Sequence, residues 1–275
     1  MTLSTIRNNP AKQKKVKTKK QKAIAATCAV AFWLLVWHVV SLCVGSELVL
    51  VSPVKVVQTL FTVIFDPDFL KTVWYSAARI LGGFFTALTL GTVLGWAASR
   101  IWVVETLLRP ITAVIKATPV ASFIILVLLW FSGKNLSVII SMLMVFPVIY
   151  MNVLEGIRNA DEKLLEMAQV FRLSVGKKLL YIYLPAVAPF FVSACSVSLG
   201  LCWKSGIAAE VIGTPDGSIG AVFYQAKIFL QTSELLAWTV VVVAVSVAFE
   251  KLFMFLLRLV LKKLKMEDVL NGKRA

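Results

Sequence analysis

The chain has 275 residues, of which 59% are hydrophobic and only 16% are charged, and its formal net charge is +15. A soluble globular domain would not stay in solution with this balance, so the composition indicates an integral membrane protein. The four cysteines lie in apolar stretches without C-x-x-C or other metal-ligand spacing. The sequence therefore predicts neither a disulfide framework nor a bound metal.

Runs without charged residues mark the expected membrane spans, because about 20 apolar residues are needed to cross the roughly 30 Å hydrocarbon core. We expect an all-α integral membrane protein with about six transmembrane helices. Proline removes a backbone donor and predicts breaks or kinks in three of them, at Pro119, Pro147, Pro185 and Pro189. The expected spans lie within residues 22–47, 79–100, 116–134, 134–155, 178–204 and 235–261.

The distribution of Lys and Arg predicts the orientation of the chain. Most of them fall in residues 7–22, 100–116, 158–178 and from 251 onward. Cytoplasmic segments carry this excess, so both termini are expected in the cytoplasm. The positive charge then reflects topology, and no aromatic residues interleave with the basic tail as in a nucleic-acid site. The first apolar run exceeds a signal-peptide core and lacks an A-x-A-like site, so we expect a retained anchor.

Two further patterns concern packing and the membrane surface. Residues 52–65 are apolar but too short to cross, so they predict a helix lying on the outer interface. Small residues recur every four positions in the second span, which predicts a face for close helix packing. The partner could lie within this chain or in a second copy. The residues of this ladder are Gly83, Ala87, Gly91 and Gly95.

A charged, helix-patterned block, DEKLLEMAQVFRLSVGKKLLYIYLP, occupies residues 161–185 between the fourth and fifth spans. Asp161 is placed to cap a first helix, and Ser174 to cap a second short helix that runs toward the membrane. The first helix has one predicted apolar stripe, and the block is either a partner-binding surface or a solvated loop that only connects two spans. The stripe consists of Leu164, Leu165, Ala168 and Phe171, whereas Glu162, Glu166 and Gln169 turn the other way.

This block resembles the EAA motif of permease subunits of ABC importers, written E-A-A, three residues, G, nine residues, I-x-L-P. Its spacing matches throughout, from Glu166-Met167-Ala168 to the Ile-Tyr-Leu-Pro sequence at 182–185. Met167 replaces the middle alanine, and Arg172 stands where the family usually has glycine. A glycine would suit a turn with positive φ, and Gly176 is near enough to take over part of that role.

Further segments, at 76–95, 107–133 and 203–220, resemble the nitrate, sulfonate, taurine and bicarbonate branch of these permeases. The resemblance implies the type I ABC importer permease fold and a coupling helix seated in an ATPase subunit. In it, Glu166 would be the acidic contact, Ala168 the small residue that permits close approach, and Phe171 part of the seating face. Met167, Arg172, Leu184 and Pro185 complete the implied coupling set.

The resemblance also assigns a role to the segment from Lys204 to Glu234. In the family this region lies at the outer gate and the binding-protein contact, which would involve Glu210, Gly213, Gly217 and Gly220. The alternative is a flexible connection with one solvated acid. The expected organisation is then a basic cytoplasmic tail at 1–22, a permease domain at 23–265 with its coupling loop at 156–185, and a C-terminal tail at 266–275.

The absence of several motifs limits the functions that the chain can have. No Gly-Lys pair has the spacing of a P-loop, and the single histidine gives no persuasive catalytic set. The first five expected spans carry no charge in their centres, unlike secondary transporters. These absences favour a transporter that is powered from outside over a secondary carrier. The resemblance then implies a non-enzymatic permease in a bacterial inner membrane, paired as a homodimer, that contacts membrane lipid and imports a small anion such as a sulfonate or nitrate. ATP and Mg would bind to a partner ATPase, and an external solute-binding protein would confer selectivity.

The sequence is also compatible with other functions. A stand-alone secondary carrier or channel, or a membrane scaffolding protein, is compatible with the span count. Within ABC import, a vitamin or heterocyclic precursor is an alternative substrate.

Overall fold

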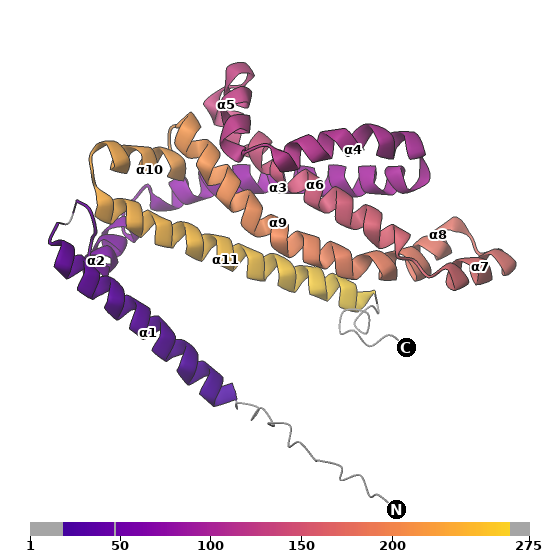
Figure 1. Cartoon of the computed structure of the whole chain (residues 1–275), viewed down its shortest axis with the longest axis horizontal. Helices are drawn as coiled ribbons and strands as arrows, with labels where there is room; N and C mark the ends of the chain where they lie inside the picture. The colour runs from indigo at the N-terminus through magenta and orange to yellow at the C-terminus, as the bar shows by residue number, and fades with distance from the viewer. Residues whose placement is uncertain (1–18, 47, 265–275) are drawn as a thin grey trace, which may run out of the picture. The chain divides into compact units, whose positions relative to one another are not determined.

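The computed structural model describes residues 19–46 and 48–264, so the expected C-terminal tail and most of the basic tail lie outside the described residues. Every regular element within these ranges is helical. The elements are α1 (Lys19–Val44), α2 (Pro53–Ile64), α3 (Phe69–Arg100), α4 (Trp102–Ala117), α5 (Val120–Trp130), α6 (Gly133–Arg158), α7 (Glu162–Val170), α8 (Val175–Lys178), η1 (Leu179–Tyr183), α9 (Leu184–Gly213), α10 (Ile219–Ile228) and α11 (Thr232–Lys263) (Figure 1).

Five of the described helices are long and apolar enough to cross a membrane, and a sixth span results if α4 and α5 count as one. The predicted all-α fold with about six spans is thus confirmed. The third span differs from the predicted one at 116–134, because residues 102–117, expected in a cytoplasmic segment, form the helix α4, which meets α5 at 110°. The break lies at Thr118, which is extended at φ −81° and ψ 132° just before Pro119. Proline disfavours the helical conformation of the preceding residue, so the predicted break at Pro119 is confirmed.

The fifth span is longer than the charge pattern predicts. We expected it to end near Lys204, but α9 continues to Gly213. Glu210 therefore lies inside a spanning helix and not in a loop. In the fourth span, α6 continues as one helix across Pro147. The charged side chains Lys204 and Glu210 mislead a prediction from charge-free runs, because helix propensity does not end where apolar character ends.

The chain folds as two compact units divided between Lys55 and Val56. In the first unit, two side chains of α1 fix the segment that follows it. Trp37 Nε1 donates to the carbonyl of Val51 at 3.1 Å, and Ser41 Oγ donates to that of Leu50 at 2.9 Å. The predicted short apolar helix is confirmed as α2, and its position on a membrane surface remains a prediction.

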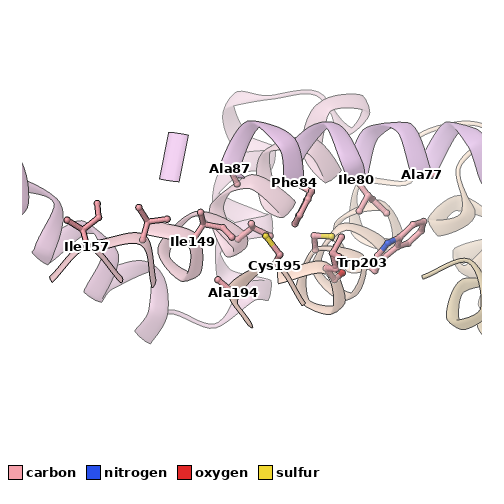
Figure 2. Packing of buried hydrophobic residues seen from close by; sticks show 13 residues of the cluster. Ala77, Ile80, Phe84, Ala87, Ile149, Ile157, Ala194, Cys195 and Trp203 are labelled. Atoms are coloured by element: carbon pink, nitrogen blue, oxygen red, sulfur yellow. Dashed lines mark hydrogen bonds between the residues drawn. The ribbon is translucent and has the colours of Figure 1, made fainter. Parts of the chain in front are cut away.

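The main core of the second unit joins α3, α6 and α9 (Figure 2). Trp203, Ile80 and Phe84 are among its largest fully buried side chains. Helices α3 and α9 therefore present apolar faces to each other and to α6. The core residues are Ala77, Ile80, Phe84, Ala87, Val145, Ile149, Val153, Ile157, Ala194, Cys195, Leu199, Cys202 and Trp203.

The glycine ladder of α3 packs against α6 of the same chain, which settles the question of its partner. A Cβ added at Gly91 would lie 2.9 Å from Cβ of Ile149, and one added at Gly95 would lie 3.0 Å from Cβ of Val153. Gly82, outside the ladder, faces open space. Glycine therefore allows the two backbones to approach closely, as predicted.

Helix α9 connects two ends of the second unit (Figure 1). The short helices α7 and α8 precede its first residue, and α10 follows its last. With 30 residues, α9 is about 45 Å long at 1.5 Å per residue. The polar loop that contains α7 and α8 and the helix α10 thus lie at opposite ends of the bundle.

Candidate functional site

The first predicted helix of the charged block is confirmed as α7. Asp161 is its N-cap, and the carboxylate oxygen Oδ1 accepts a hydrogen bond of 2.9 Å from the amide of Lys163. Glu162 lies in the first turn, where a negative charge suits the helix dipole. These contacts give a short helix a defined start on a polar loop.

One side of α7 packs onto its own chain. Ala168 is 0% exposed and forms a small core with Ala160 and Ile182, against which Leu165 is partly buried. The predicted stripe is therefore split, since Leu165 and Ala168 face inward and its other members do not. Ala168 permits close approach of α7 to its own chain, so a direct contact of this side chain with another subunit is not possible in this conformation.

The other side of α7 carries exposed apolar side chains. Leu164 is 41% exposed, Met167 47% and Phe171 71%. Glu166 is also exposed. With Leu165 and Ala168 turned inward, Leu164, Met167 and Phe171 form what we call the outward face of α7, and Glu166 lies at its edge. This face offers apolar area to a partner, with one acid beside it.

Arg172 supplies the left-handed turn that ends α7. Its φ is +49°, in the region that glycine favours. The amide of Leu173 donates to the carbonyl of Ala168 at 2.9 Å, and the amide of Arg172 donates to that of Gln169 at 3.0 Å. This pair of bonds is a Schellman motif. Gly176 lies within α8 without a positive φ, so the expectation that it takes over this role is wrong.

The junction between the charged loop and α9 is a π-helical turn. Ser174 is the N-cap of α8, as predicted, although its side chain makes no capping hydrogen bond. The π-helix η1 follows, and the amide of Leu184 donates to the carbonyl of Leu179. Pro185 sits in the first turn of α9 and has no amide to donate. The wider turn accommodates this proline, and π-turns of this kind often occur at functional sites.

Glu210 lies at the opposite end of the bundle and is 0% exposed. Its Oε2 accepts hydrogen bonds from Ser76 Oγ at 2.6 Å and from the amide of Gly220 at 3.3 Å. The solvated acid of the alternative interpretation is therefore wrong. A direct contact of this carboxylate with a binding protein is also not possible in this conformation, because other side chains cover it.

Ser76 of α3 and Glu210 of α9 cap the N-terminus of α10. The amide of Ile219 donates to Ser76 Oγ at 2.9 Å, that of Gly220 to Glu210, and that of Ala221 to Ser218 Oγ at 3.0 Å. The first amides of a helix have no partner within it, and the dipole favours negative charge there. Glu210 and Ser76 thus fasten α10 onto α9 and α3. We refer to these two side chains as the trans-cap.

The three candidate glycines of this region serve three different contacts. Gly213 ends α9, and a Cβ there would lie 2.8 Å from Cδ2 of Leu136. Gly217 has a φ of +74° in the turn before α10. A Cβ at Gly220 would overlap Glu210. Each position explains a glycine structurally, and the outer-gate assignment of the set remains a prediction.

Sequence reasoning missed Ser76 and Ser218. No sequence pattern indicates which residue a serine in an apolar helix contacts. Ser76 could not be paired with Glu210 in advance, because the two are 134 positions apart. Ser218 directly before an apolar run is a capping signal that the sequence does contain.

Apolar spans with a folded polar loop at one end define this chain as a multi-pass helical membrane protein. The chain belongs to the family of binding-protein-dependent transport system inner membrane components, whose model matches residues 87–266. It is thus a membrane permease subunit of an ABC importer.

Curated relatives agree with this family. The putative aliphatic sulfonates transport permease protein SsuC of Bacillus subtilis is 29% identical over 216 residues, covering 78% of each chain. The taurine transport system permease protein TauC of Escherichia coli is 27% identical and covers 78% of this chain and 80% of the relative. The nitrate import permease protein NrtB of Synechocystis is 25% identical, with 74% and 76% covered.

A solved structure supports the fold. The crystal structure of an amino acid ABC transporter with histidines matches with a TM-score of 0.50 over 70% of this chain and 96% of that chain. At 17% identity, this likeness concerns the fold alone.

Proposed function

We propose that this permease forms the pathway for a small oxyanion, such as a sulfonate or nitrate, delivered by a solute-binding protein. The support is the substrates named for its relatives, which are aliphatic sulfonates, taurine and nitrate. In this proposal the membrane domain spans residues 23–265 with its coupling loop at 156–185, and both termini are cytoplasmic.

The proposal that a partner ATPase drives transport rests on the outward face of α7. Phe171 is 71% exposed and Met167 47%, on a short helix of a charged loop. Aromatic and methionine side chains are enriched in protein interfaces, and contiguous exposed apolar groups mark such sites. This face seats in a separate ATPase subunit, with Glu166 as its acidic contact. ATP and Mg bind to that subunit.

Force would pass from α7 to the spans through η1 and α9. Leu165 and Ala168 pack α7 against its own chain, so a displacement of α7 carries Ile182 with it. Leu184 and Pro185 begin the helix that runs to Glu210 and the trans-cap. The binding protein acts at the end near α10, and two copies of the permease work with two ATPase subunits.

Substitution of Phe171 tests the coupling. Phe171→Glu should abolish co-purification of the ATPase subunit, because an apolar contact is replaced by an uncompensated charge. The matched control is Phe229→Glu, since Phe229 is equally exposed, at 70%, but ends α10 at the opposite end. Retention of the ATPase by Phe171→Glu, or equal loss with both variants, would refute this docking face.

Uptake into vesicles tests the substrate and the mode of transport. The permease, ATPase and binding protein should together take up radiolabelled taurine, ethanesulfonate or nitrate when ATP is present. Uptake of thiamine or its pyrimidine precursor instead would refute the oxyanion. Transport by the permease alone under a proton or sodium gradient would refute the ATP-driven mechanism.

A further inference from the structure

A cavity of about 360 Å³ lies between the end of α3 and the coupling loop. Trp96 and Arg100 line it from α3, and Lys178 and Tyr183 line it from the segment that leads into α9. This volume would hold roughly ten water molecules, enough for a small polar group. The cavity is thus an open cleft of mixed polar and apolar lining, with two aromatic rings in its wall.

The inward side of α7 completes the wall. Leu165 and Gln169 line the cavity from α7, and Val175 does so from the start of α8. Leu165 faces away from Phe171 and the outward face. A partner seated on the outward face therefore leaves this cavity to a different ligand.

Arg100 is held in place by the aromatic rings. Its guanidinium carbon lies 5.0 Å from the ring centroid of Trp96 and 4.8 Å from that of Tyr183. The two rings meet edge to face with their centroids 5.8 Å apart. Cation–π contacts hold a guanidinium without using its hydrogen-bond donors. In the described part of the chain, the guanidinium of Arg100 makes no hydrogen bond or ion pair, so those donors are available.

The charged residues that line the cavity are all basic. Lys178 adds a second cation, and none of the residues that line the cavity is acidic. Two cations that line one cavity without a carboxylate repel each other, and an anion bound there would offset that repulsion. The planar guanidinium fork is suited to two oxygens of one oxyanion, with lysine as a point charge beside it.

We propose that this cavity binds a phosphate- or sulfonate-type oxyanion, held by Arg100 and Lys178 between Trp96 and Tyr183. The oxyanion joins the end of α3 to α7 and α8, and so fixes the orientation of the coupling helix from its inward side. It comes either from the headgroup of an anionic phospholipid or from a free oxyanion in the adjoining solution. Trp and Tyr are enriched at the level of membrane headgroups, and this placement is compatible with the lipid source.

The test uses the complete permease–ATPase complex and two ligand arms. In one arm, phosphatidylglycerol is titrated into phosphatidylcholine nanodiscs, and bound lipid is counted by native mass spectrometry. In the other, inorganic phosphate or ethanesulfonate is added to the complex in phosphatidylcholine alone, and binding is followed by calorimetry. Saturable binding at one site per permease in either arm is expected, and the arm in which it occurs identifies the source.

Alanine variants of two neighbouring lysines, one inside the cavity and one outside it, test which residues bind the oxyanion. Lys178→Ala should weaken binding about tenfold, because one charge-assisted contact is lost. Lys177→Ala removes the same charge next to it, but Lys177 does not line the cavity, so affinity should stay within about twofold. Arg100→Lys keeps the charge and loses the fork, and should also weaken binding. No saturable binding in either arm, or equal loss in Lys177→Ala and Lys178→Ala, would overturn the proposal.

Discussion

Ser76 Oγ donates a hydrogen bond of 2.6 Å to Glu210 Oε2, and this bond joins α3 to α9 across 134 positions of the sequence. No cation forms an ion pair with the buried carboxylate in the described ranges. Its compensation comes instead from Ser76 and from the amide of Gly220 at the positive end of α10. Helix α10 is therefore held by groups from two other helices.

Loss of the carboxylate should release α10. Glu210→Leu leaves the Gly220 amide and the Ser76 hydroxyl without their acceptor, and the free energy of unfolding should fall by about 3 kcal/mol. Glu210→Gln keeps an acceptor oxygen and should lose less than half of that. Hydrogen exchange should show faster exchange of the Ile219 and Gly220 amides in Glu210→Leu.

The control for this series is Ser198→Ala, since Ser198 is buried in the same helix and makes no hydrogen bond. It should change neither stability nor exchange at α10. Unchanged exchange at Gly220 in Glu210→Leu would contradict the trans-cap.

A methyl group added in the glycine ladder should separate α3 from α6. Gly91→Ala places a Cβ 2.9 Å from Cβ of Ile149 and should cost about 1–3 kcal/mol of stability. Gly82→Ala on the same helix meets nothing within 4 Å and should be neutral or stabilising. Thermal unfolding of the purified permease distinguishes them, and equal melting temperatures would show that the ladder is not a contact face.

The turn after α7 should improve with glycine. Arg172→Gly removes the cost of a left-handed conformation for a residue with a Cβ, and should stabilise the loop by about 1 kcal/mol. Arg172→Ala keeps that cost while it also removes the guanidinium, so it should give no such gain. Protease sensitivity of residues 161–178 reports the loop directly. A gain with both variants would assign the effect to the side chain and not to φ.

Much of the fold follows from the sequence because membrane spans and their packing faces have strong local signals. The charge-free runs locate the spans, the four-residue ladder at Gly83–Gly95 predicts a close helix contact, and Pro119 predicts a break. Asp161 likewise predicts the start of α7. Each of these depends on residues a few positions apart.

The features that could not be predicted depend on contacts between residues that lie far apart in the sequence. The charge pattern places Glu210 in an outer segment beyond the fifth span, and its burial is explained only by its contacts with Ser76 and Gly220. The division of the α7 stripe depends on Ile182 packing beneath Ala168, which periodicity does not reveal. Arg172 adopts a conformation typical of glycine because the surrounding turn bonds outweigh its intrinsic cost.

The most direct test of the coupling claim is site-specific photocrosslinking in the assembled transporter. A benzophenone side chain in place of Phe171, on the outward face of α7, should crosslink to the ATPase subunit in high yield. The same group in place of Leu165, six residues earlier and on the inward side, should crosslink within the permease. Crosslinks to the ATPase from position 165 but not from 171, or from neither, would contradict the role of α7 as the coupling helix.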